Sequence, residues 1–279
     1  SQAATATSAG IVVEQDNTAN ALARIGTDDD GATTNDGTEV KVTTTGTTSN
    51  SPLTISGTLN RATATGNTAS TTVNESDFAS NATSAFSAAR QQNTGEADVA
   101  AEGATAAIIN NKSVTATVID TDISISSGAT TGSPLTISGS TDSAVATANS
   151  LTQNMTLTGT TLTLGTVSAT AETVGTDTGA TGQALVSSRQ TNTFTDVSAT
   201  NTASSVTMSA GVTNGSSLDL TTNTQDSTAT GSTAANVLAV SGTTVGTGVG
   251  IVSSQTSDAQ SSVLAATTGQ AGIAVTSLG

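Results

Sequence analysis

The chain has 279 residues, a formal net charge of -15, and no Cys, His, Trp or Tyr. These absences exclude disulfide bridges, catalysis by a Ser–His pair and zinc sites of the usual type. The six basic residues are scattered and no aromatic platform accompanies them, so we expect no nucleic-acid binding.

Ser and Thr account for 99 residues, whereas only 10% of the residues are charged and Pro occurs twice. A disordered Ser/Thr-rich stalk usually has more Pro, more charge and fewer β-branched residues. The abundant Val, Ile and Thr favour strands. We therefore expect an ordered β-structure with a thin core of small side chains, with the disordered stalk as an alternative. No run of 18 apolar residues occurs, which predicts that the chain does not span a membrane.

The first residues, Ser1-Gln2-Ala3-Ala4, are typical of a mature N-terminus left after signal-peptide cleavage. This pattern predicts a secreted protein in an extracellular or cell-surface location. The acidic net charge then serves solubility, because it keeps strand edges from pairing at random.

A segment centred on Gln is the first repeated element along the chain. Its copies end at Gln15, Gln91, Gln190 and Gln255, so the spacing between them is uneven. We expect whole repeat units to separate these side chains, so that they form no continuous ladder. Each Gln is then either a buried amide bonded to a turn backbone or a solvated turn residue.

An acidic cluster follows the first Gln segment. Asp28, Asp29 and Asp30 precede Gly31, and Asp36 precedes Gly37. Carboxylate oxygens beside turn glycines suit a calcium ion, although the spacing matches no EF-hand. The cluster is therefore interpreted as a calcium site or as a solvated acidic loop, and we expect no other cofactor.

A second family of repeats sets the length of the unit. The sequence Ser-Pro-Leu-Thr-Ile-Ser-Gly begins at Ser51 and again at Ser133, and a weaker copy begins at Ser216. A second element follows each copy at a constant distance and carries Asn67 in the first unit and Asn149 in the second. Two linked elements at one offset indicate a true repeat. The copies are residues 51–57, 133–139 and 216–222, followed by residues 64–68, 146–150 and 229–233.

Within a unit, apolar residues alternate with Ser and Thr, as in residues 114–118 and 123–125. This alternation predicts strands with one buried face. The best helical candidate is residues 77–92, which are rich in Ala; a strand–turn–strand remains an equal alternative there.

Many short strands of small residues predict an all-β fold, a β-solenoid (β-helix) of degenerate units of about 82 residues. We expect each unit to hold about three coils of roughly 20–30 residues. The chain then forms one elongated repeat domain, residues 1–279, with approximate units 10–84, 85–183, 184–249 and a partial unit 250–279. Tandem β-sandwich domains are the alternative, but such cores usually contain aromatic residues.

The predicted strands contain residues for two further kinds of surface chemistry. Asp120 with Asp122, or Glu96 with Asp98, could act as paired carboxylates in glycoside chemistry if alternate strand residues share a face. The platforms that sugars need are missing, so we expect no enzyme. A row of Thr, residues 156, 158, 161 and 163, raises ice binding as an alternative.

The run Ala-Thr-Ala-Thr-Gly-Asn-Thr-Ala-Ser at residues 62–70, and the Gln-x-Asn-Thr element at residues 15–18, resemble repeats of bacterial extracellular β-solenoid surface and fibre proteins. The holdfast-anchor and biofilm-matrix types are the nearest such family. The resemblance implies a secreted, polymeric, adhesive or matrix role without catalytic residues.

No charged or proline-rich cap is visible at either end of the sequence, and exposed strand edges invite pairing. We therefore expect a structural subunit of an extracellular filament or surface adhesin that assembles head-to-tail. Its partners would be copies of itself, a polysaccharide matrix or an outer-surface anchor. A monomeric β-helical module that binds a glycan, a surface or ice is the alternative.

Overall fold

The structure is a computed structural model, and it describes residues 8–26, 38–76, 84–98, 108–110, 112–159, 161–162, 184–242, 244–245, 249–268 and 272–277. Every regular element in these ranges is a strand and none is a helix, so the prediction of an all-β chain is confirmed. All strand pairs are parallel except β8 (Glu96–Asp98) with β9 (Ile108–Asn110), which form an antiparallel pair.

The strands stack in four levels, each hydrogen-bonded to the next. Level 1 contains β1 (Ser8–Asn17), β2 (Ala21–Ile25), β3 (Glu39–Thr44), β4 (Thr48–Ser49), β5 (Leu53–Ser56) and β6 (Leu59–Ser76). Level 2 contains β7 (Ser84–Thr94), β10 (Lys112–Ile119), β11 (Asp122–Ser127), β12 (Thr130–Thr131), β13 (Leu135–Ser138), β14 (Thr141–Thr158) and β15 (Thr161–Leu162). Level 3 contains β16 (Ala184–Thr193), β17 (Thr195–Thr202), β18 (Ser205–Ala210), β19 (Thr213–Asn214), β20 (Leu218–Thr221), β21 (Thr224–Ser241) and β22 (Thr244–Val245). Level 4 contains β23 (Val249–Ser257), β24 (Ser262–Thr268) and β25 (Gly272–Ser277).

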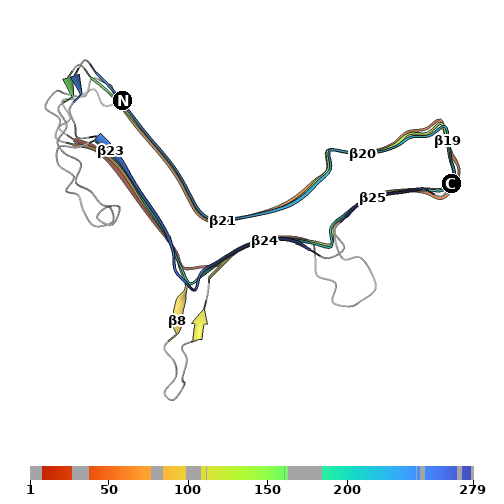
Figure 1. Ribbon diagram of the computed structural model, residues 1–279, viewed down its shortest axis with the longest axis horizontal. Coiled ribbons are helices and arrows are strands. Elements are labelled where there is room, and N and C mark those ends of the chain that lie inside the picture. Colours follow the sequence, from red (N-terminus) through yellow and green to blue (C-terminus); the bar gives the residue numbers. More distant parts are fainter. Residues whose placement is uncertain are drawn as a thin grey trace.

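Viewed along the stack, the levels superpose as one flat, bent loop of chain (Figure 1). Layer 1 of this loop consists of the sheets β1-β7-β16-β23, β2-β10-β17-β24 and β25-β18-β11-β3. Layer 2 consists of the sheets β20-β13-β5 and β21-β14-β6, and β19-β12-β4 connects the two layers at one end. In-register parallel stacking of this kind is consistent with a solenoid-like fold.

The repeats found in the sequence pair directly with one another. Leu135 aligns with Leu53 on one side and with Leu218 on the other, and Ile137 aligns with Ile55 in the same sheet. One level therefore takes up a whole sequence repeat. The expectation of about three coils per repeat was wrong, and independent sandwich domains do not fit strands that pair across units.

The core is a thin seam between the two layers. At one end Ile123, Ile125 and Met208 of layer 1 pack against Leu135 and Ile137 of layer 2. In the middle, small side chains of β6 and β14 pack against Val114 and Val197. Columns of Ala, Val, Ile, Leu and Met thus repeat from level to level, and burial of their apolar surface drives the layers together.

The long strands of layer 2 bend near their middle (Figure 1), where the pairing register passes over Gly66, Ala148 and Gly231. A Cβ on Gly66 would lie 2.6 Å from the backbone oxygen of Ala148 and 2.6 Å from Oδ1 of Asn93. Glycine is required at position 66, where backbone and a buried amide come too close for a Cβ, whereas the aligned position of the next level accommodates Ala148.

The helical candidate is not a helix where the structure describes it. Residues 84–94 form strand β7, and residues 77–83 lie outside the described residues. The alternative of a strand therefore holds for its second half, because pairing with β1 and β16 outweighs the helical propensity of Ala.

Candidate functional site

The four Gln residues form one continuous ladder across all four levels. The Nε2 atom of Gln91 donates to Oε1 of Gln15 over 2.7 Å, that of Gln190 to Gln91 over 2.9 Å, and that of Gln255 to Gln190 over 2.8 Å. Gln91 and Gln190 are fully buried. The expectation that whole units separate these residues was wrong, because one unit is one level.

Each Gln of levels 1 to 3 also bonds to layer 2. Gln15, Gln91 and Gln190 donate to the backbone oxygens of Thr68, Ser150 and Thr233 over 2.8, 2.9 and 2.7 Å. These acceptors lie within strands, not in turns, so the Gln ladder ties the two layers together as well as the levels.

Two columns of Asn face each other beside the Gln ladder. Asn67 of β6 donates to Asn149 of β14 over 3.0 Å, and Asn93 of β7 donates to Asn192 of β16 over 3.1 Å. The columns are cross-linked, since Nδ2 of Asn93 also donates to Oδ1 of Asn149 over 2.9 Å, and Asn149 to Asn192 over 3.0 Å. All four side chains are buried, and their mutual bonds remove the cost of burying polar groups.

The sequence pointed to Asn67 and Asn149 but missed Asn93 and Asn192. The signal that could have found them is the Gln-x-Asn spacing, which also places Asn17 in the first level; the fourth level has Ser257 at this position. Asn17 donates to Asn93 over 3.1 Å. Interior amides of this kind specify register, because a shifted strand leaves them unpaired.

A buried carboxyl group lies further along layer 2. Asp142 of β14 is fully buried, and its Oδ1 accepts a hydrogen bond of 2.8 Å from Asn60, while its Oδ2 has no hydrogen-bond partner. Burial raises the pKa of Asp142, and the nearby charge of Asp122 adds to the shift, against the hydrogen bond from Asn60. Because the group is enclosed, no substrate can reach it and its role is internal.

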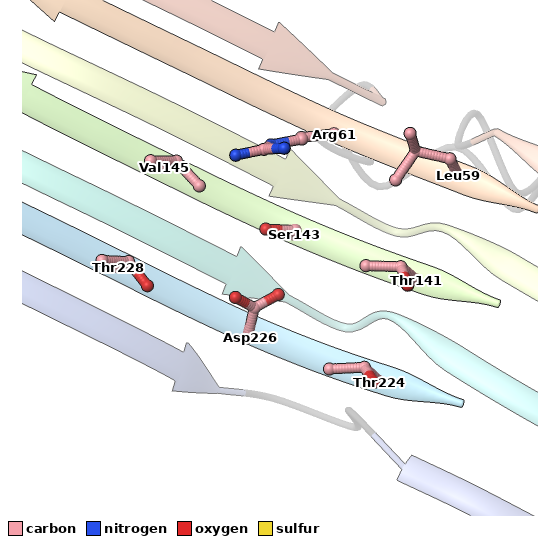
Figure 2. A pocket seen from close by; sticks show the side chains of 8 residues that line it. All are labelled: Leu59, Arg61, Thr141, Ser143, Val145, Thr224, Asp226 and Thr228. Atoms are coloured by element: carbon pink, nitrogen blue, oxygen red, sulfur yellow. The ribbon is translucent and has the colours of Figure 1, made fainter. Parts of the chain in front are cut away.

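A shallow depression of about 380 Å³ lies on the outer face of β6, β14 and β21 (Figure 2). Arg61 and Asp226 lie on either side of Ser143 in one row across the three strands, with Leu59 near one end. Two strand spacings, about 9.6 Å, separate the backbones that carry the opposite charges. The depression is open and threonine-lined, so it offers a binding surface and no enclosed reaction site.

The structure places only one of the two carboxylate pairs on a single strand. Asp120 has a φ of 51° and lies in the turn between β10 and β11, whereas Asp122 begins β11, so the premise of two alternate residues on one strand was wrong. Glu96 and Asp98 are at the two ends of the short strand β8.

The predicted calcium ligands Asp28, Asp29, Asp30 and Asp36 lie outside the described residues. Within the described ranges no group of three or more His, Cys, Asp or Glu could hold a metal ion. In the same ranges no helix is long and apolar enough to cross a membrane. Of the predicted threonine row, Thr156 and Thr158 are exposed on β14, Thr161 is in β15, and residue 163 is outside the description.

Comparison of the chain with protein-family models, with curated proteins and with solved structures finds no match in any of the three.

Proposed function

We propose that the chain is a β-solenoid in which one turn takes one whole sequence repeat. Support comes from the direct pairing of equivalent residues of successive repeats in both sheets of layer 2, and from ladders of identical amides along the stack. A solenoid of this design gains stability with every added level, because each level satisfies the backbone and covers the core of the one before.

As its function, we propose a structural subunit of an extracellular filament or surface adhesin that assembles through its β ends. The observation that carries this proposal is the in-register stacking of equivalent side chains from level to level, which a level of any chain with the same repeat can continue. Among the described residues β6 and β21 each pair with β14 alone, so each has an 18-residue edge without a strand partner. Long strand edges favour the addition of further chains.

The proposed partners are copies of this chain, with a polysaccharide matrix or an outer-surface anchor as the place of attachment. The interior suits such a role, since it contains hydrogen-bonded amides and small aliphatic side chains. A scaffold of this kind needs mechanical stability and no catalytic site.

Electron microscopy of the purified full chain in the absence of denaturant tests this function. We expect filaments whose axial repeat is a small multiple of the spacing of about 4.8 Å between strands. Isolated short particles at high protein concentration would contradict self-assembly. The extracellular location is tested separately by fractionation of the source cells.

A monomeric binding module is the second candidate, and the depression between Arg61 and Asp226 favours it. A zwitterionic or hydroxyl-rich ligand such as a glycan would match its charges and Thr lining. Titration of the monomer with a panel of glycans distinguishes the candidates: this function requires saturable binding that Arg61→Ala abolishes and that Arg24→Ala, an exposed cation of β2, leaves unchanged.

A further inference from the structure

A cluster of buried polar residues interrupts the apolar seam between the two layers. It consists of Ser140 and Asp142 at the start of β14, Thr121 at the corner between β10 and β11, and Ser204 and Asn201 at the corner between β17 and β18; all five are fully buried. Along layer 2 the cluster falls between the Ile, Leu and Met side chains at one end of the seam and the small side chains of its middle. Polar atoms in such a position need partners.

Hydrogen bonds connect the two layers through this polar cluster. The Nδ2 atom of Asn201 donates to the backbone oxygen of Asp142 over 3.0 Å, and Oγ1 of Thr121 donates to Oγ of Ser204 over 2.8 Å. Ser204 in turn donates to Oδ1 of Asn201. From level 1, Nδ2 of Asn60 donates to Oδ1 of Asp142 over 2.8 Å. The corners of layer 1 therefore bring hydroxyl and amide groups close to the strand that carries Asp142.

Two oxygen atoms of the cluster have no hydrogen-bond partner. These are Oδ2 of Asp142 and Oγ of Ser140. The two residues alternate along the chain and both are fully buried, so their side chains point to the same side, toward the seam. Because buried polar atoms nearly always have a partner, these two oxygens indicate a ligand that bonds to oxygen.

The carboxylate of Asp142 also lacks a counter-charge. Within the described ranges neither ion pair involves Asp142, and Arg61 lies on the outer face of the sheet (Figure 2). The charge that acts on Asp142 is that of Asp122, which has the same sign. Protonation does not resolve the problem, because a proton on Oδ2 would have no acceptor. A cation satisfies the charge and the oxygen together.

We propose that Asp142 binds a hard metal cation, sodium or calcium, together with the hydroxyl oxygen of Ser140 and further neutral oxygens of the polar cluster. Such cations take oxygen ligands in flexible geometry, whereas magnesium requires a near-ideal octahedron. One carboxylate among neutral oxygens also distinguishes this site from the acidic segment that includes Asp28. The cation joins a corner of layer 1 to the start of the longest strand of layer 2. This inference goes beyond the proposed filament and does not rest on it.

Urea denaturation of the full chain, followed by circular dichroism at mildly alkaline pH, tests the inference. The chain is first treated with a chelator in tetramethylammonium chloride, and sodium or calcium chloride then replaces this salt at constant ionic strength. The cation enters as the chain refolds, so enclosure of the site is no barrier at equilibrium. A cation that binds only the folded chain, at about 100 times its Kd, raises the ratio of folded to unfolded chain about 100-fold.

Three variants show whether the response comes from this site. Asp142→Asn should abolish it, and in chelator this variant folds and is more stable than the parent, because its amide carries no buried charge. Ser140→Ala should weaken cation binding by about tenfold or more and change stability in chelator little, since its Oγ has no partner in the protein. Asp226→Asn is the matched control: Asp226 lies in the same sheet on the outer face (Figure 2), so this variant responds as the parent does.

A response to sodium or to calcium that Asp142→Asn alone abolishes supports the inference and identifies the cation. Equal stability in sodium, calcium and tetramethylammonium chloride overturns it, and a buried water or a proton then accounts for the two oxygens. A calcium response that Asp142→Asn retains also overturns it, because the ion then binds elsewhere, as in the acidic segment that includes Asp28. A loss in Asp226→Asn equal to that in Asp142→Asn overturns it as well, since general electrostatics then explain the response.

Discussion

The side chain of Gln91 bonds both to the neighbouring levels and to the opposite layer. Its Nε2 donates to Gln15 in the level below and to the backbone oxygen of Ser150 in the opposite layer, and its Oε1 accepts from Gln190 above. Burial of a polar amide contributes no hydrophobic stabilisation. The presence of Gln91 in the core therefore indicates that its hydrogen bonds, which fix the register of the strands, are needed.

Replacement of Gln91 by Leu should destabilise the chain strongly. The variant leaves the Oε1 of Gln15, the carbonyl of Ser150 and the Nε2 of Gln190 short of a bond, so we expect a loss of about 3 kcal/mol in the free energy of unfolding, measured by urea denaturation. Gln92→Leu is the matched control, because Gln92 faces outward on the same strand and bonds to Arg90 and Thr94. It should cost less than about 1 kcal/mol. Equal losses would show that the ladder contributes nothing specific.

Asp142 makes the stability of the folded chain depend on pH in a defined direction. Its folded-state pKa is raised by burial, so the folded chain binds its proton more tightly than the unfolded chain does. Below the ordinary Asp pKa of about 3.9 both states are protonated and the group has no effect. As the pH rises through the raised value, the buried charge forms and stability is lost.

Asp142→Asn should therefore stabilise the chain at neutral pH and have little effect in acid. We expect a gain of about 1–2 kcal/mol at pH about 7, because the neutral amide removes the buried charge. Asp226→Asn, one level away on the outer face, is the control without such a gain. Urea melts of the three proteins at acid and neutral pH measure the effect. Equal stability of parent and Asp142→Asn at neutral pH would refute the cost assigned to this carboxylate.

Some contacts of single residues could be predicted from the sequence and others could not. Asn67 and Asn149 were predictable because they recur at the constant offset of the repeat. The bonding of the Gln residues was not, since their uneven spacing hid that they align in space. The strands β8 and β9 lie within level 2, between β7 and β10, in the longest interval, that between Gln91 and Gln190, and leave the stacked strands in register. The burial of Asp142 depends on side chains from other segments, which no local pattern reports.

At the scale of the strand, the corners repeat as faithfully as the strands themselves. Gly26, Asp120 and Ala203 follow the ends of β2, β10 and β17, and all three have positive φ, at 82°, 51° and 56°. The corner therefore imposes a left-handed backbone on whichever residue stands there. Ala pays a steric penalty of about 1–2 kcal/mol in that conformation, and Gly does not.

Opposite substitutions at this corner should have opposite effects. Ala203→Gly should raise the free energy of unfolding by about 0.5–1 kcal/mol, because relief of strain exceeds the extra chain entropy of Gly. Gly26→Ala should lower it by about 2 kcal/mol or more, since its Cβ would lie 1.8 Å from the backbone oxygen of Ile119. Thermal melting followed by circular dichroism measures both.

Gly46→Ala provides the control for these two variants, because a Cβ at Gly46 meets nothing within 4 Å. It should change the melting temperature by little. A destabilised Ala203→Gly would show that the side chain of Ala203 contributes more through packing than its backbone costs in strain.

For the whole molecule, the sequence predicted the strands but not the path of the chain. Alternation in residues 114–118 identified a strand of layer 1, and the constant offset of the repeat identified what Leu53 and Leu135 share. The length of a repeat does not determine how many turns the chain makes within it. The 18-residue strands of layer 2 make one wide turn instead of about three narrow ones, and their length was hidden by the Gly and Asn at the bend.

Val114, Val197 and Val263 form one column of aligned valines. Val197 of level 3 is buried, whereas Val263 of level 4 is half-exposed, so substitutions in this column test the architecture. In dilute solution Val197→Ala should lower the free energy of unfolding by about 2 kcal/mol, and Val263→Ala by less than about 0.5 kcal/mol. Leu264→Ala, on the outer face of the same strand, is the control and should likewise cost little. Equal losses for Val197→Ala and Val263→Ala would mean that burial does not set the contribution of this column.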